Sequence, residues 1–239
     1  MAALCVLSLA SVANAAPGVG EAVYGATIEK GVTELEARYG RLSGGPDAGE
    51  DGLVLELEHG FSDRFAGAVL AEFEREPGGS RKLEALSVEG VVHFGRVDSL
   101  GLDVAGYVEF EAVRHAADKV ETKLLLQHRQ GPFDARLNLI VEKELEGGEP
   151  LEFGYAASVD WAAVGEFRLG VAAFGELGST HDFLPRAEHF AGPIVKTEIE
   201  HLPGDSEIEI EAGYLFALGA ARDDADGQWR LLIGWETRF

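Results

Sequence analysis

Glutamate is the residue of this sequence whose type and spacing most often suggest chemistry. The chain has 239 residues, with 42 Asp and Glu against 20 Lys and Arg, and a formal net charge of -22. Many carboxylates recur at every second position, as in Glu34 and Glu36 or Glu207, Glu209 and Glu211. In a β-strand, residues two apart lie on the same face. Such a face holds several negative charges close together, where they stay hydrated, attract cations or become protonated.

The carboxylates that are predicted to face inward are candidates for the lining of an enclosed space. Far fewer bases than acids share this face, and two interpretations stay open. Either the space is filled with water and attracts cations, or acids and bases on neighbouring strands pair, fill the space and prevent conduction. The residues that we assign to the lining are Glu36, Arg38, Glu56, Glu72, Glu109, Lys123, Arg136, Glu142, Arg168, Lys196, Glu198, Glu209, Arg230 and Arg238. The acidic balance argues against a nucleic-acid partner, because contact with phosphates needs clustered Lys and Arg.

The sequence gives little support for catalysis. Ser179, His181 and Asp182 have the residue types of a hydrolase triad, but sequence neighbours rarely form a triad and no nucleophile elbow accompanies them. The seven histidines show neither H-x-H nor H-E-x-x-H spacing. We therefore expect no catalytic residue, no metal site and no cofactor.

A short acidic turn near the end of the chain resembles part of a calcium-binding loop. It contains Asp223, Asp224 and Asp226 before Gly227. An EF-hand is excluded, because Arg222 stands where the first ligand would be. Loose binding of divalent cations and a simple solvated turn both remain open.

The elements that must position the glutamates are predicted to be β-strands. From Gly31 to Phe239 apolar and polar residues alternate, and short clusters of Gly, Pro, Asp and Ser interrupt the alternation at regular intervals. The predicted strands cover residues 31–42, 50–60, 64–76, 81–94, 99–113, 119–129, 132–145, 150–161, 165–177, 191–202, 206–218 and 228–239. Each has at least the roughly 9 to 11 residues that a tilted strand needs to cross a bilayer.

The predicted connections alternate between short turns and longer loops. Short turns are expected near 130–131 and 203–205, whereas the intervening connections include the two longest, 178–190 and 219–227. This alternation and the even strand number predict an all-β fold, a single closed antiparallel up-and-down transmembrane β-barrel of about 12 strands. Both termini are expected on the periplasmic side.

The alternation alone does not decide whether the apolar face lines a core or contacts lipid. A soluble barrel of this size would enclose a lumen too wide for side chains to fill, although a β-sandwich could bury the same residues. Aromatic residues such as Phe61, Phe133 and Trp229 lie near strand ends on the apolar face, as expected for residues at a membrane interface. We therefore expect the apolar face to contact lipid.

The first residues have the pattern of a secretory signal peptide. Leu4 to Val12 is apolar, and Ala13-Asn14-Ala15 fits a cleavage site. We expect three parts: a cleaved signal peptide at 1–15, an N-terminal periplasmic segment at 16–30 and the barrel at 31–239. Cys5, the single cysteine, lies in the first part, so the mature chain would carry no thiol.

The last strand carries a resemblance to a known class. Gly227 to Phe239, an alternating strand with a terminal phenylalanine, resembles the C-terminal signature of bacterial outer-membrane β-barrels. This resemblance implies that Trp235 and Phe239 act as an assembly signal for the barrel-assembly machinery. Stretches such as Val23-Tyr24-Gly25 and Gly213-Tyr214-Leu215-Phe216 look similar to an uncharacterised group of proteobacterial envelope barrel proteins, a resemblance that implies no activity.

Together these observations predict an exported protein of the bacterial outer membrane, in contact with outer-membrane lipid. The expected function is a small pore that favours cations through an acidic lumen, with small solutes or cations as its cargo. A structural barrel with a lumen plugged by salt bridges is the alternative. An outer-membrane lipid-modifying enzyme is a third interpretation, which the strand histidines His93, His128 and His201 do not support, because none has a serine two residues away on the same face.

Overall fold

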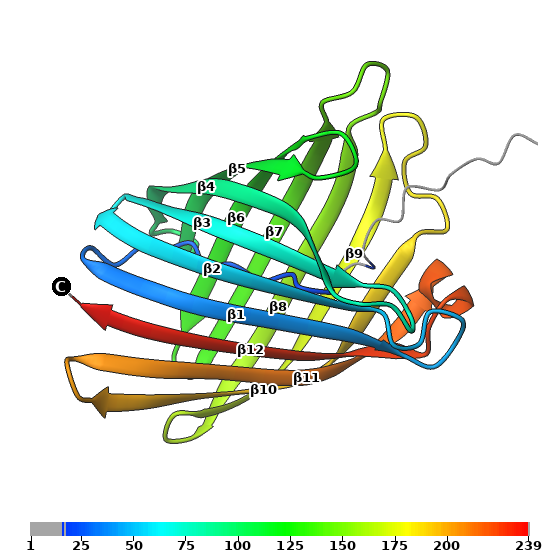
Figure 1. Cartoon of the computed structure of the whole chain (residues 1–239). Helices are drawn as coiled ribbons and strands as arrows, with labels where there is room; N and C mark the ends of the chain where they lie inside the picture. Colours follow the sequence, from blue (N-terminus) through cyan, green and yellow to red (C-terminus); the bar gives the residue numbers. More distant parts are fainter. Residues whose placement is uncertain (1–15, 17, 239) are drawn as a thin grey trace, which may run out of the picture.

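The computed structural model describes residue 16 and residues 18–238, apart from the side chain of His201 (Figure 1). The expected signal peptide with Cys5, and the terminal Phe239 of the expected assembly signal, lie outside the described residues. Within the described part, no helix is long and apolar enough to cross a membrane.

The described residues form one closed barrel of twelve antiparallel strands, which confirms the predicted fold (Figure 1). The strands are β1 (Val32–Ser43), β2 (Asp51–Ser62), β3 (Phe65–Arg75), β4 (Lys82–Val97), β5 (Leu102–Val113), β6 (Lys119–Gln130), β7 (Phe133–Glu144), β8 (Glu152–Val164), β9 (Phe167–Ser179), β10 (Glu188–Leu202), β11 (Ser206–Gly219) and β12 (Gly227–Arg238). A short 3-10 helix, η1 (Ala220–Asp223), follows β11. β12 closes the barrel by pairing with β1, with Val32 opposite Arg238 and Ser43 opposite Gly227.

The connections alternate in length as predicted, which gives the barrel two distinct ends. Short turns at 63–64, 98–101, 131–132, 165–166 and 203–205 lie at one end, here called the short-turn end, where β1 starts and β12 finishes. The loops at 44–50, 76–81, 114–118, 145–151, 180–187 and 220–226 lie at the other, the long-loop end. The largest differences from the predicted bounds are three residues: β4 and β8 run on to Val97 and Val164, β5 begins later at Leu102, and β10 begins earlier at Glu188. A bulge between His93 and Gly95 displaces the pairing near the end of β4.

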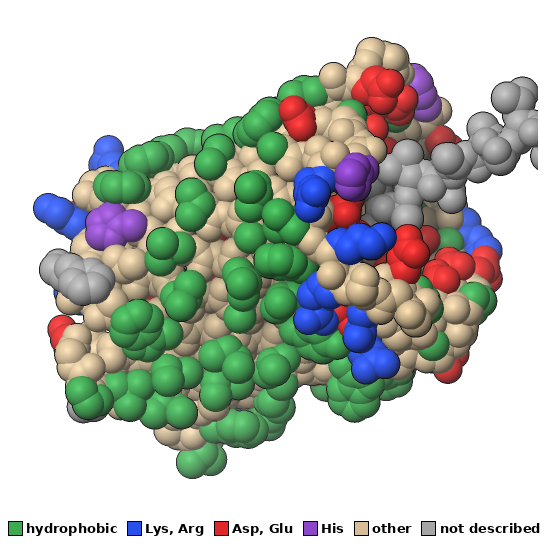
Figure 2. Space-filling model, in the orientation of Figure 1, with side chains coloured by type: hydrophobic (Ala, Val, Ile, Leu, Met, Phe, Trp, Pro, Cys, Tyr) green, Lys and Arg blue, Asp and Glu red, His purple; other side chains and the backbone are tan. Residues whose placement is uncertain are grey.

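The outer wall of the barrel is apolar. Val69 is 54% exposed, and Leu57, Val108 and Ile233 are exposed as well. Figure 2 shows hydrophobic side chains spread along the wall, with charged side chains gathered towards the long-loop end. A continuous apolar surface of this extent marks a membrane or protein contact rather than a water-exposed wall.

A peptide segment fills part of the lumen. Residue 16 and residues 18–31, here called the inner segment, run inside the barrel from the long-loop end to the short-turn end, where β1 begins. Val19, Val23 and Ala26 are buried there. Gly60 of the wall has no room for a side chain, because a Cβ would stand 2.1 Å from the carbonyl oxygen of Glu29. This position inside the barrel differs from the periplasmic location expected for 16–30, because the period-two pattern of the strands gives no information on a segment that does not pair as a strand.

Candidate functional site

Two buried amide side chains hold the inner segment in the lumen. Asn138 accepts from the backbone N–H of Tyr24 at 2.8 Å and donates to its carbonyl oxygen at 3.0 Å. Gln127 accepts from the N–H of Ala26 at 3.0 Å. Both amides are fully buried. They satisfy backbone groups that no neighbouring strand pairs, so the inner segment is fixed by the wall rather than by a β-ladder.

Two arginines of the lining hold the same segment by its carbonyl groups. Arg136 donates to Val23 at 3.3 Å. Arg230 donates to Gly18 at 3.2 Å and to Glu21 at 2.9 Å. These contacts give two of the predicted lining residues a structural role.

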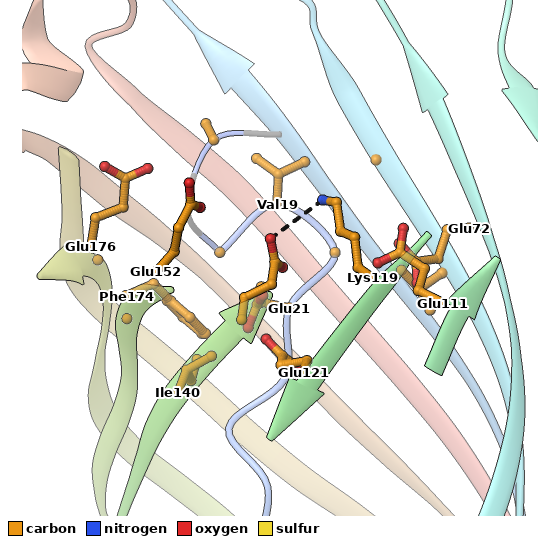
Figure 3. Close-up of a pocket in the computed structure, with 18 of the residues that line it drawn as sticks. Val19, Glu21, Glu72, Glu111, Lys119, Glu121, Ile140, Glu152, Phe174 and Glu176 are labelled. Carbon is orange, nitrogen blue, oxygen red and sulfur yellow. Dashed lines mark ion pairs between the residues drawn. The ribbon is translucent and has the colours of Figure 1, made fainter. Parts of the chain in front are cut away.

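Two cavities lie in the space left around the inner segment. Each has a volume of about 510 Å³, one towards the long-loop end and one towards the short-turn end. In the long-loop cavity, Glu72, Glu111 and Lys119 lie on one side of the inner segment, and Glu152 and Glu176 lie on the other (Figure 3).

Tyr24 lies between the two cavities and lines both. Its hydroxyl accepts from the Arg38 guanidinium at 2.9 Å, and the Lys123 ammonium lies 4.8 Å from the centre of its ring. The ring of Tyr107 lies 5.0 Å from the ring of Tyr24, and the same ammonium lies 4.8 Å from its centre. Aromatic rings and cations at these separations attract one another, so this cluster forms a well-packed narrow region, here called the waist.

The strand register aligns glutamates across the wall. The row runs from β11 through β12 and β1 and then strand by strand from β2 to β8. On each of these strands the residue directly opposite the previous member is a glutamate, except on β3, where it is Ala68. This glutamate row consists of Glu207, Glu236, Glu34, Glu58, Glu89, Glu109, Glu121, Glu142 and Glu152. Its first four members line the short-turn cavity and its last three line the long-loop cavity. Like charges directly opposite one another destabilise a sheet, so this alignment has an electrostatic cost.

Bases neutralise only part of the row. Lys123 pairs with Glu121 at 2.9 Å, and Lys119 pairs with Glu142 at 3.6 Å. Among the described residues, no Lys or Arg ion pair reaches the other seven members. The remaining bases of the lining instead gather around carboxylates outside the row, where Lys196 and Arg230 lie 3.2 and 3.1 Å from Glu211.

The structure places the predicted lining residues as follows. The short-turn cavity is lined by Glu36, Glu56, Arg136, Arg168, Lys196, Glu198 and Glu209. The long-loop cavity is lined by Arg38, Glu72, Lys123 and Glu142. Glu109 accepts from Tyr107 at the waist, and Arg230 is buried over the ring of Phe174. Arg238 lies apart from these, with its side chain 55% exposed at the short-turn end and 2.6 Å from Glu29.

Sequence reasoning missed the uncharged part of the site. Tyr24, Tyr107, Gln127 and Asn138 hold the waist and the inner segment, yet the prediction considered charged residues only. The signal that could have found the amides is their place on the inward face of predicted strands, where an amide needs a partner. Tyr24 gave no such signal, because it precedes the first strand.

The two other motifs of the sequence have structural roles. The Ser179 hydroxyl accepts from the backbone N–H groups of His181 and Asp182 at 3.2 and 3.3 Å, as in an ordinary turn. Asp223 pairs with Arg186 at 2.7 Å. The Arg186 hydrogen bond and positive charge lower the pKa of Asp223 from its usual value.

The fold is similar to those of solved outer-membrane proteins. An outer membrane channel from Pseudomonas putida F1 has 13% sequence identity and a TM-score of 0.60, covering 93% of this chain and 99% of that one. The NanC porin has 11% identity and a TM-score of 0.59, covering 86% and 100%. A KdgM porin in complex with disordered oligogalacturonate has 12% identity and a TM-score of 0.55, covering 86% and 99%. No protein-family model and no curated protein matches the chain.

Proposed function

We propose that this chain is a bacterial outer-membrane barrel that forms a small pore favouring cations. The similarity of its fold to porins and channels and its apolar outer wall support this placement. The wall would contact outer-membrane lipid. Trp235, exposed on the outer wall, and Phe239 would form the signal read by the barrel-assembly machinery. Membership of the proteobacterial envelope group remains a prediction.

The glutamate row is the observation that carries the proposed selectivity. It begins in the short-turn cavity, passes the waist at Glu89 and Glu109, and reaches the long-loop cavity. Neighbouring strands lie about 4.8 Å apart, so a cation moving along the row stays close to a carboxylate except at the step over Ala68. Carboxylates lining an enclosed aqueous path concentrate cations and exclude anions.

The inner segment supports a narrow path rather than an open one. It occupies the middle of the lumen, and Tyr24 packs between Arg38 and Lys123 at the waist. The same contacts favour the alternative, a structural barrel whose lumen is closed. Conduction separates the two functions.

Purified protein in planar lipid bilayers tests the proposal. With a KCl gradient across the membrane, we expect single-channel current with a reversal potential of the sign for K⁺ preference. The row variant E34Q/E109Q/E152Q removes one carboxylate from each cavity and one from the waist, and it should move the reversal potential towards zero. The control E146Q/E149Q/E166Q makes the same charge change on exposed turns and should leave the reversal potential unchanged.

Three outcomes would count against the proposal. A reversal potential of the opposite sign would reject cation preference. Equal shifts in the two triple variants would show that overall charge, not the row, sets the selectivity. Folded protein without any current would favour the closed structural barrel, with folding verified by heat-dependent mobility on SDS gels.

A further inference from the structure

Three carboxylates of β2 and β4 converge at the short-turn side of the waist. Glu56 and Glu58 project from β2 and Glu89 from β4, and one oxygen of each lies within 4.8 Å of the others. In the register, Glu58 and Glu89 are both opposite Ala68 of the intervening β3. Ala68 is buried between them and has a small side chain.

One oxygen of this cluster has no partner. Glu89 is 8% exposed, and its Oε1 is buried without a hydrogen bond. Its Oε2 lies 2.8 Å from the Tyr107 hydroxyl, whose single proton it shares with Glu109, and 3.3 Å from the Tyr24 hydroxyl. A buried carboxylate oxygen without a donor is costly, so the site is incomplete as it stands.

Among the described residues, ion pairs with Lys or Arg reach only one carboxylate of the cluster. Arg38 is the base in contact with it, and its Nη1 is shared between Glu56 at 2.9 Å and Glu36 at 3.2 Å. Within the described residues, neither Glu58 nor Glu89 forms an ion pair with Lys or Arg. Two of the three carboxylates therefore have no base in contact with them, and one of these two carries the unfilled acceptor.

We propose that Glu56, Glu58 and Glu89 bind a divalent cation of the calcium type. Calcium binds carboxylate oxygens at about 2.3 to 2.6 Å, so two oxygens on opposite sides of one ion lie about 4.6 to 5.2 Å apart. The spread of the three oxygens fits within this span. Glu56 and Glu58 also line the short-turn cavity, from which water would complete the coordination. The site joins β2 to β4 across β3 and needs no passage of ions through the waist.

Terbium luminescence tests the site on the full-length protein folded in detergent. Tb³⁺ takes oxygen ligands like Ca²⁺, and tyrosine excitation sensitises its emission when the ring is close. Tyr24 and Tyr107 both contact Glu89, so we expect tyrosine-sensitised emission that Ca²⁺ displaces. E89Q and E58Q should each weaken binding about tenfold or more, since each removes a charged ligand.

The matched control is E166Q. Glu166 belongs to a second carboxylate group with metal-ligand spacing among the described residues, formed with Glu198 and Glu200 at the short-turn end, and it is exposed. Its loss removes the same charge and should leave Ca²⁺-displaceable emission unchanged. A68L, which places a larger side chain between Glu58 and Glu89 without changing charge, should weaken binding as the ligand variants do. The proposal is overturned if wild-type protein gives no Ca²⁺-displaceable signal, or if E166Q weakens binding as much as E89Q. Because the readout is binding, these results do not depend on the pore proposal, whose own test is current.

Discussion

At the scale of single residues, adjacent positions of one strand have opposite surroundings. Leu139 of β7 is 39% exposed on the outer wall, whereas Asn138 is fully buried in the lumen and holds Tyr24. With the outer wall in lipid, L139R should destabilise the barrel by about 2 to 4 kcal/mol, because it places a charge near the middle of the bilayer. Urea titration of refolded protein in vesicles measures this cost, and L139A is the neutral control. A cost no larger than that of L139A would contradict the proposed lipid contact.

The alternation along β7 by itself predicts that N138R is mild, because position 138 faces the lumen, but the contacts of Asn138 predict a larger effect. The alternation of apolar and polar residues places Asn138 correctly in the lumen. It does not reveal that both polar groups of its amide form hydrogen bonds with the backbone of Tyr24. An arginine there would leave the backbone N–H of Tyr24 without its acceptor. We now expect N138R to detach the inner segment.

A pH effect is expected from Glu50 in the loop between β1 and β2. Burial and the negative charge of Asp47 raise the pKa of Glu50 from 4.5 to about 7. A raised pKa means that the folded state binds the proton more tightly than the unfolded state. Protonated Glu50 therefore contributes stability to the folded state relative to ionised Glu50. This contribution is fully present below about pH 4.5 and is lost as the pH rises through about 7. E50Q should flatten the dependence of the unfolding midpoint on pH between 4.5 and 7, and an unchanged dependence would rule out Glu50 as its source.

At the scale of elements, the strands were predictable and the inner segment was not. Each strand carries its own period-two pattern, because one of its faces forms the outer wall and the other lines the lumen. Strand positions therefore follow from local sequence. The inner segment lacks such a pattern, since its partners are side chains far away in sequence. Asn138 lies 114 residues from Tyr24, and Gln127 lies 101 residues from Ala26. Contacts of this kind follow only from the closed barrel.

Loss of the two amides should release the inner segment and widen the path. N138A/Q127A removes the partners of the Tyr24 and Ala26 backbone groups, which water would then solvate. We expect larger single-channel conductance than wild type with a folded barrel. Q130A, at an exposed amide near the end of β6, is the control and should conduct as wild type. If N138A/Q127A conducts no more than Q130A, the amides do not restrict the path.

At the scale of the whole molecule, closure of the barrel creates the candidate site. Glu207, Glu236 and Glu34 are neighbours only because β12 pairs with both β11 and β1. The sequence predicted inward glutamates one strand at a time. Their alignment depends on the register of each strand pair, which shifts at bulges such as that between Gly60 and Ser62 and is not encoded in the alternation itself.

A row that acts as one extended charge should lose selectivity in concentrated salt. The screening length is about 30 Å at 0.01 M and about 3 Å at 1 M, whereas neighbouring members lie about 4.8 Å apart in the strand-pairing direction. In dilute KCl all members therefore act together on an approaching ion, and in 1 M KCl each acts only on ions in contact. We expect the cation-to-anion permeability ratio to fall steeply between these concentrations in wild type and in E146Q/E149Q/E166Q. The row variant E34Q/E109Q/E152Q should start from a lower ratio and change less. A ratio independent of salt would place the selectivity in direct contacts at the waist instead of the glutamate row.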